Sequence, residues 1–153
     1  MNQVSIRPAN LNDLQILLEF EQGVIKAERP LDPFLAEGKL FYYNIPELIS
    51  DENTQLLIAT INNIPVASGY VRLEKSKVYH KNSTHGYIGF IFVKEKYRGK
   101  KISSLILADL KKWAKENNTN ELRLDVYTNN TAAIKAYERF GFTKSLVNMR
   151  TEI

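Results

Sequence analysis

The pattern of apolar and polar positions along the chain predicts a mixed α/β protein. Residues 4–7, 56–61, 64–73, 86–93 and 121–127 are rich in β-branched, aromatic or alternating apolar side chains and are predicted as strands. Residues 11–28, 45–49, 102–116 and 131–140 carry signals of helices, most of them apolar positions at helical spacing. Residues 142–153 are expected to add one or two closing strands. The predicted order is therefore β-α-α-β-β-β-α-β-α-β.

Short polar signals mark where several of these elements begin and end. Asn10 with Asp13 three residues later is related to a capping box and predicts a helix start. Pro30 disfavours helix at the residue before it, so the first helix is expected to end there. The pair Asn62-Asn63 predicts a tight hairpin turn, because asparagine tolerates positive φ. Gly141 is expected to end the last helix.

A strand, a basic turn and a helix follow one another between residues 86 and 117. The turn holds Lys94, Lys96, Arg98, Lys100 and Lys101, with only Glu95 of opposite sign. The first N–H groups of a helix have no intrahelical acceptor, and the helix dipole is positive at that end. Gly99 allows the backbone to approach a ligand closely. The unit therefore favours a phosphate or pyrophosphate ligand, with an ordinary solvated basic turn as the alternative.

Two segments resemble motifs of the GNAT family of N-acetyltransferases. Residues 98–103 are similar to its acetyl-coenzyme A loop, Gln/Arg-x-x-Gly-x-Gly/Ala, with Lys101 and Ser103 standing where small residues are usual. Residues 130–142 resemble its Asn-x-x-Ala-Ile-x-x-Tyr-x-x-x-Gly-Phe segment, and every specified position is filled. The two motifs occur in the family's order with a strand between them. The resemblance is specific over residues 86–142, and the predicted fold is a single GNAT-like domain over residues 1–153.

The resemblance implies acetyl-coenzyme A as cosubstrate and places its site. The pantetheine arm would lie between two splayed parallel strands, residues 86–93 and 121–127, and its amides would meet the backbone of residues 91–93. The pyrophosphate would rest on the backbone N–H groups of residues 98–104. The candidate cofactor-binding residues are Ile91, Phe92, Val93, Arg98, Gly99, Lys100, Lys101, Ile102, Ser103, Ser104 and Asn130. Asn130 is also a candidate helix cap, and no metal site is expected.

The resemblance assigns Tyr137 the role of general acid toward the leaving thiolate. The alternative is a core aromatic residue, because Ala133, Tyr137 and Phe140 share one helix face. A backbone N–H near Phe92 or Val93 is expected to stabilise the oxyanion. The chain has no cysteine, which excludes a cysteine-bound acyl intermediate. We therefore expect direct attack of a primary amine in a ternary complex, with a non-catalytic acyl-coenzyme A-binding module as the alternative.

The base that deprotonates the amine is not identified by any motif. Residues 86–93 contain no carboxylate, although many family members carry a glutamate on this strand. A water chain is one alternative, and the side-chain candidates are Glu21, Glu28, Asp32, Asp125, His80 and His85. Both histidines fall in residues 74–85, which are expected to form an exposed polar connection. Residues 28–32 lie where family members shape the acceptor site, so their acids are candidates to recognise an amine cation.

Composition sets the remaining expectations. The 153 residues are 44% hydrophobic and carry a net charge of +4, with a sequence pI near 9.2. Nucleic acid is not expected as a partner, because aromatic residues do not interleave with the lysines. The N-terminus has no apolar leader and the chain no long apolar run, so a cytoplasmic protein without a membrane partner is expected. The acceptor stays open among small amines, aminoglycosides, amino acids and peptide amines, and the resemblance is compatible with a homodimer.

Overall fold

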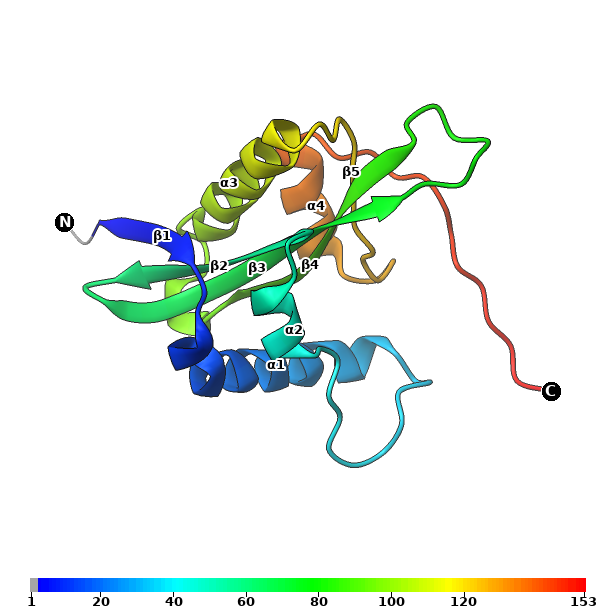
Figure 1. Cartoon of the computed structure of the whole chain (residues 1–153). Coiled ribbons are helices and arrows are strands. Elements are labelled where there is room, and N and C mark those ends of the chain that lie inside the picture. Colours follow the sequence, from blue (N-terminus) through cyan, green and yellow to red (C-terminus); the bar gives the residue numbers. More distant parts are fainter. Residues whose placement is uncertain (1–2) are drawn as a thin grey trace.

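A twisted five-stranded sheet forms the centre of the molecule (Figure 1). The structure is a computed structural model and describes residues 3–153. The strands lie in chain order across the sheet: β1 (Val4–Pro8), β2 (Thr54–Ile61), β3 (Ile64–Lys75), β4 (Thr84–Val93) and β5 (Leu122–Arg123). The first four pair antiparallel, and β5 is parallel to β4. The predicted mixed α/β class is confirmed.

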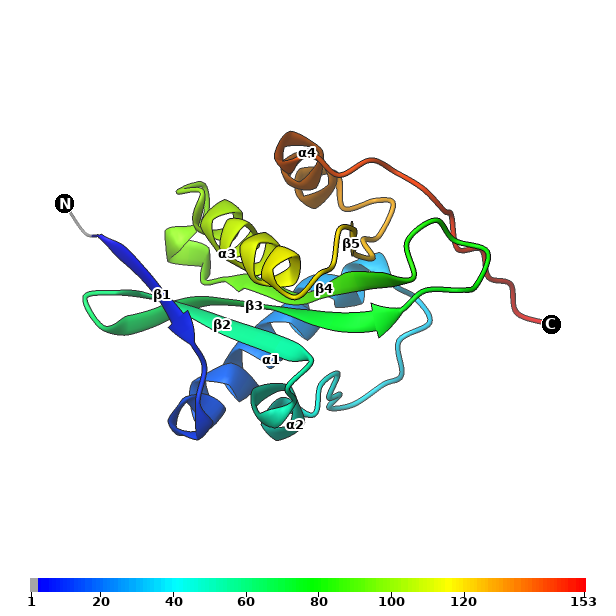
Figure 2. The same ribbon diagram turned by 45° about the horizontal axis from the view of Figure 1, so that its top comes forward.

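Helices cover both faces of the sheet (Figures 1 and 2). One face carries α1 (Leu14–Glu28) and α2 (Ile45–Ser50), and the other carries α3 (Ile102–Glu116) and α4 (Thr131–Phe140). Short 3₁₀ turns at Leu11–Asp13, Arg29–Leu31 and Glu95–Tyr97 join the larger elements. Each face has its own apolar core, one built on Leu17 and Phe20 of α1 and the other on Ile106 and Leu110 of α3. Among residues 3–153, no helix has the length and apolar character needed to cross a bilayer.

The predicted helix cap at Asn10 and the predicted hairpin turn at Asn62-Asn63 are both confirmed. The Asn10 side chain accepts the Asn12 N–H at 2.9 Å, and the Asp13 carboxylate accepts the Asn10 N–H at 2.9 Å, which completes the capping box. The hairpin between β2 and β3 turns through Asn62 and Asn63, whose φ angles are 50° and 64°. These contacts depend on residues close in sequence, which is why the pattern alone could place them.

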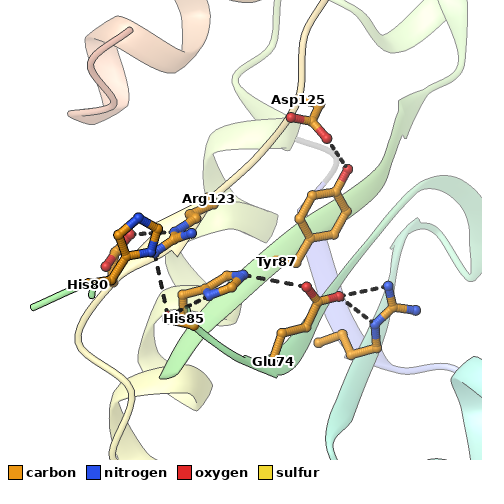
Figure 3. Close-up of polar contacts among 9 residues, drawn as sticks. Glu74, His80, His85, Tyr87, Arg123 and Asp125 are labelled. Atoms are coloured by element: carbon orange, nitrogen blue, oxygen red, sulfur yellow. Dashed lines mark hydrogen bonds and ion pairs between the residues drawn. The ribbon is translucent and has the colours of Figure 1, made fainter. Parts of the chain in front are cut away.

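The predicted exposed connection over residues 74–85 is wrong at both ends. Glu74 pairs across the ladder with His85, so β3 and β4 extend further than expected and only the loop 76–83 joins them. His85 is 7% exposed. Its Nδ1 lies 2.8 Å from the Ser76 Oγ, and its Nε2 lies 3.4 Å from the Glu74 carboxylate (Figure 3). His85 is therefore buried with polar partners for both ring nitrogens, which a polarity pattern does not reveal.

The structure also has fewer strand residues in the C-terminal part of the chain than the prediction. The predicted strand over residues 121–127 is reduced to the two residues of β5, and residues 142–153 form no strand. The ladder between β4 and β5 ends after Tyr87 and Arg123, so residues beyond Arg123 have no neighbouring strand to pair with. Leu124 and Phe142 still pack against the core, whereas Leu146 and Met149 of the last segment are exposed.

A β-bulge in β4 was not predicted. The register shifts between Ser68 and Tyr70, so that Phe90 and Ile91 of β4 both face Gly69 of β3. Phe90 adopts a positive φ of 56°. Gly69 makes room, because a Cβ there would lie 2.6 Å from the Ile91 Cδ1. The Ser68 hydroxyl donates a 3.0 Å hydrogen bond to the Phe90 carbonyl and so satisfies the polar group that the bulge removes from the ladder.

We expect Ser68→Ala to lower the free energy of unfolding by about 1–3 kcal/mol, because it leaves the Phe90 carbonyl buried without this donor. Urea denaturation measures the loss. Ser5→Ala, on an exposed position of β1, is the matched control and should change stability by less than about 0.5 kcal/mol. Equal effects of the two substitutions would contradict the role of Ser68 in the bulge.

Candidate active site

The last half of β4 has a strand partner on one side only. β4 and β5 pair through Gly86 with Leu122 and through Tyr87 with Arg123, and beyond these pairs the two strands separate (Figure 1). Beyond this point β4 pairs with β3 alone, and its other edge has no strand partner. We call the region between this edge of β4 and the segment after β5 the gap. The predicted pantetheine contacts, Ile91, Phe92 and Val93, lie on this stretch and are half-buried. An extended amide chain can bind such an edge as an added strand.

The predicted pyrophosphate loop follows at the end of β4. It passes through Gly99 with φ 76° and Lys101 with φ 61°, and α3 begins at Ile102. The left-handed conformation of Lys101 explains why the family pattern has glycine at this position. No side chain caps the first turn of α3, which leaves its backbone N–H groups without a side-chain acceptor. Ser103 lies inside that turn.

The side chains of the loop have different surroundings. Arg98 donates from Nε to the Val93 carbonyl at 3.1 Å and so ties the loop to the end of β4. The Lys100 ammonium lies 5.4 Å from the centre of the Tyr97 ring. Ile102 is buried in the core, so only its backbone is available to a ligand. The positive charges that remain exposed lie directly at the uncapped helix end, where they add to the helix dipole.

The second motif forms α4, as predicted. Asn130 accepts the Ala133 N–H at 3.3 Å, which shows the capping role. Tyr137 is half-buried, and its ring packs against Phe142 at 6.0 Å. Burial, with a smaller contribution from the negative charge of Glu28, raises the pKa of Tyr137 to about 12. Tyr137 therefore keeps its proton at neutral pH and can donate it or a hydrogen bond.

A polar cluster joins segments that are far apart in sequence. The Tyr127 hydroxyl, beyond β5, donates to Asp32 Oδ2 at 2.7 Å, and Arg150 donates to Asp32 Oδ1 at 3.1 Å. The Phe34 N–H donates to the same Oδ1 at 2.9 Å. The Tyr127 hydrogen bond is the largest of the effects that hold the pKa of Asp32 below its usual value. Asp32 is 6% exposed and is therefore a fixed anion with three donors.

Glu28, the last residue of α1, has a different environment. Burial raises the pKa of Glu28, a hydrogen bond from Tyr42 lowers it, and the negative charge of Asp32 raises it. The Tyr42 hydroxyl is buried, and burial together with its interaction with Glu28 raises the pKa of Tyr42. Glu28 also helps to raise the pKa of Tyr127 to about 12. Glu28 therefore acts electrostatically on the aromatic hydroxyls around it.

The other base candidates have hydrogen-bond partners or positions of their own. Glu21 is fully buried, and its Oε2 accepts the N–H groups of Tyr42 and Tyr43 at 2.8 and 2.7 Å, so it holds that segment in place. Asp125 accepts the Tyr87 hydroxyl at 2.9 Å (Figure 3). His85 is seven residues before Phe92, which is about 20 Å or more along a strand.

His80 lies in the loop before β4, where its Nδ1 is 3.1 Å from Arg123 (Figure 3). The two histidines are thus at the opposite end of β4 from the gap. Two open surface hollows also lie away from the polar cluster: one of about 430 Å³ between α3, β5 and α4, and one of about 470 Å³ beside α1. Neither includes Glu28, Asp32 or Tyr137 in its lining.

Comparison with known proteins now adds to this geometry. The model of the acetyltransferase (GNAT) family matches residues 20–142, which is more than half of the chain. The chain belongs to the GNAT family. This assignment supports acetyl transfer from acetyl-coenzyme A as its class of chemistry. A search of curated protein sequences found no significant match.

Solved structures agree on the GNAT fold. A tetramutant of a Bacillus halodurans protein superposes with a TM-score of 0.86 at 19% identity, with 97% of this chain and 99% of that chain covered. A protein from Clostridium acetobutylicum that is described as a predicted acetyltransferase and was solved with acetyl-coenzyme A superposes with a TM-score of 0.73 at 18% identity. The match covers 98% of this chain and 96% of that chain. An aminoglycoside 6′-N-acetyltransferase from Acinetobacter haemolyticus superposes with a TM-score of 0.73 at 17% identity, with 97% of this chain and 99% of that chain covered.

Because the Tyr127 hydrogen bond is the largest cause of the lowered pKa of Asp32, we expect Tyr127→Phe to raise that pKa toward the ordinary value of an aspartate. A carboxylate with a lowered pKa adds stability above its unfolded-state pKa and loses it as the pH falls through the folded value, so the variant should lose less stability on acidification. Carboxyl NMR titration and acid denaturation measure both effects. Tyr87→Phe, which removes a hydroxyl bonded to Asp125, should leave Asp32 unchanged; an unshifted Asp32 in Tyr127→Phe would contradict the assignment.

Proposed function

We propose that the protein transfers an acetyl group from acetyl-coenzyme A to a primary amine by direct attack in a ternary complex. The observation that carries the proposal is the gap beside β4, which leads directly into an uncapped helix N-terminus with exposed lysines. A pantetheine chain with a pyrophosphate needs these two features in this order. The family assignment supports the same chemistry.

In this proposal the free edge of β4 binds the pantetheine amides through backbone groups of Ile91, Phe92 and Val93. The turn from Arg98 to Ser104 binds the pyrophosphate through backbone N–H groups. The positive φ angles of Gly99 and Lys101 turn the chain from the end of β4 into α3 and so support that arrangement. Because Arg98 already donates to the Val93 carbonyl, we assign pantetheine recognition mainly to Ile91 and Phe92.

The acetyl carbonyl would develop negative charge when the amine attacks. A backbone N–H near the bulge, at Phe92 or Val93, is the proposed donor to this oxyanion. Tyr137 is the proposed donor to the leaving sulfur. A free thiol has a pKa of about 8.5, and the pKa of Tyr137 is about 12. Complete proton transfer from the Tyr137 hydroxyl to the thiolate would therefore cost about 5 kcal/mol. Tyr137 is therefore best suited to hydrogen-bond the departing thiolate.

A non-catalytic acyl-coenzyme A-binding module is the second candidate. The observation in its favour is that residues 86–93, which form the strand beside the gap, carry no carboxylate. Release of free thiol in the presence of a primary amine separates the two functions, because a module that only binds would leave the thioester intact. The acceptor of the solved aminoglycoside acetyltransferase places aminoglycosides among the amines to be tested.

Calorimetric titration should show saturable binding of acetyl-coenzyme A. We expect dephospho-coenzyme A, which lacks the 3′-phosphate, to bind several-fold more weakly than coenzyme A, because exposed Lys100 and Lys101 contribute positive charge near the loop. Raising the salt concentration should reduce the difference in affinity between coenzyme A and dephospho-coenzyme A, because salt screens the charges of the lysines and the 3′-phosphate. If neither coenzyme A nor its acetyl thioester binds, the proposed function is wrong.

We expect Tyr137→Phe to lower kcat by a factor of about 10²–10⁴, the usual range for a positioned proton donor. The dissociation constant for acetyl-coenzyme A should change little, because the substitution removes only the hydroxyl. Thiol release and calorimetry give the two values. Tyr79→Phe, in the exposed loop 76–83, is the control and should retain activity. Full activity of Tyr137→Phe would argue against the donor role.

A further inference from the structure

Three segments that are far apart in sequence meet at the Asp32 carboxylate. Asp32 follows α1, Tyr127 lies in the segment after β5, and Arg150 belongs to the C-terminal residues 142–153. The end of α1 and the C-terminal segment lie on the same side of the molecule (Figures 1 and 2). The segment after β5 is one wall of the gap, so the hydrogen bond from Tyr127 places Asp32 within the reach of one tyrosine side chain from that wall.

Helix α1 connects this carboxylate to the part of β4 that is proposed to bind pantetheine. Gly23 of α1 packs directly on Phe92, because a Cβ at Gly23 would lie 2.5 Å from the Phe92 Cε2. Asp32 follows the rest of α1 and one 3₁₀ turn. At about 1.5 Å per residue in an α-helix and about 2 Å in a 3₁₀ turn, Asp32 lies on the order of 13 Å along α1 from this contact. An elongated molecule can therefore reach from the end of β4 to Asp32.

Asp32 and Phe34 form a site for a cation, and Arg150 occupies it. The Arg150 Nη2 donates to Asp32 Oδ1 at 3.1 Å, and the guanidinium carbon lies 4.7 Å from the centre of the Phe34 ring. The Asp32 side chain is 5% exposed and the Arg150 side chain 46%, so the guanidinium lies on the solvent side of the carboxylate. A carboxylate beside an aromatic ring binds a guanidinium through a charge-assisted hydrogen bond and a cation–π contact.

The three donors to Asp32 are not equivalent. The Phe34 N–H donates to Oδ1 at 2.9 Å from the same loop, and the Tyr127 hydroxyl donates to Oδ2 at 2.7 Å. These two hydrogen bonds do not involve Arg150, so they can hold the carboxylate in place when Arg150 moves. Arg150 comes from a segment without helix or strand, and its neighbour Met149 is exposed. Because a half-exposed ion pair on such a segment contributes little stability, another cation can replace Arg150.

We propose that Asp32 and Phe34 bind a second cationic group of the acceptor, and that Arg150 fills this site until the acceptor arrives. The inference rests on the proposed function and adds the class of substrate, which is an elongated aliphatic primary amine with a guanidinium at its other end. The amine reaches the thioester beside β4, while the guanidinium takes the place of that of Arg150. A guanidinium fits better than an ammonium, because the group that it replaces is a guanidinium over an aromatic ring.

The internal cation also makes the site selective. A molecule that displaces Arg150 without supplying a positive charge leaves Asp32 as a buried anion without a cation, which is strongly unfavourable. Neutral amides, ureas and amines with no second charge are therefore rejected. The same competition lowers the apparent affinity for the correct acceptor, because the acceptor binds only those molecules in which Arg150 has left the site.

The cation site takes no part in the bond changes. At the other end of the acceptor, the nitrogen forms a C–N bond with the acetyl group, the C–S bond breaks, and its electron pair leaves with sulfur. The ammonium loses two protons in all, of which one ends on the thiol and the other is released to solvent. The guanidinium keeps its charge throughout, so Asp32 contributes binding and orientation.

The test compares aminoalkylguanidines that have four, six or eight methylene groups with the aminoalkylureas of the same length, which are uncharged at the urea end. Calorimetry with and without coenzyme A measures binding, and thiol release with saturating acetyl-coenzyme A measures transfer. We expect the best guanidine to exceed its urea about 10- to 100-fold in affinity and in kcat/KM. Asp32→Asn should remove this preference and leave the affinity for acetyl-coenzyme A unchanged.

Two variants of exposed residues keep the test informative if Asp32→Asn does not fold. Arg150→Gln should lower the dissociation constant and the KM of the guanidine by about 2- to 6-fold without changing kcat, because the internal competitor is gone. Phe34→Leu should weaken binding of the guanidine but not of the urea, because only a cation gains from the aromatic ring. Arg139→Gln, on the exposed surface of α4, is the matched control and should behave as wild type.

The two assays separate a failure of the cation site from a failure of the proposed function. Equal binding of guanidines and ureas, or an unchanged guanidine affinity in Arg150→Gln, would overturn the cation site, even if other amines release thiol and so support transfer. Binding of a guanidine that depends on Asp32, without thiol release from any amine, would overturn the proposed transfer and the acceptor role of the bound guanidine.

Discussion

The separation of β4 from β5 is the constraint on which the rest of the site depends. Two residue pairs join these strands, and then β5 ends while β4 continues through its bulge. The bulge needs a glycine opposite it and a buried serine to satisfy the Phe90 carbonyl. These requirements lie inside the core, so the shape of the gap is linked to the packing that stabilises the sheet. The backbone edge that results is free to bind another extended chain.

The same separation organises the charges. The negative charge of Glu28, at the end of α1, contributes to the raised pKa of Tyr127 and to that of Tyr137 in α4. The two carboxylates near the end of α1 have opposite environments. Asp32 has three donors and a lowered pKa, while Glu28 is half-buried, forms no ion pair within residues 3–153 and has a raised pKa. The two carboxyl groups are four residues apart, yet their pKa values are shifted in opposite directions.

The two ends of β4 also have different roles. At its beginning, buried His85 contacts Glu74 and Ser76, and Arg123 continues the polar network through Ser76 (Figure 3). Its last residues meet the gap and the basic turn. Lys101 adopts a left-handed conformation in that turn, which is the conformation that glycine adopts most easily. The local energetic cost of a non-glycine residue there is about 1–2 kcal/mol, which packing of α3 can offset.

The sequence by itself determined the features that depend on neighbouring residues or on motifs. These include the caps at Asn10 and Asn130, the Asn62-Asn63 turn, the helix spans and the GNAT assignment. Only the tertiary structure decided what depends on distant partners. It buried His85, shortened β5, left residues 142–153 without a strand, and joined Asp32 to Tyr127 across 95 positions. It also distinguished Glu28 from the other acids, because burial and the charge of a neighbour set a pKa, and neither is encoded in local spacing.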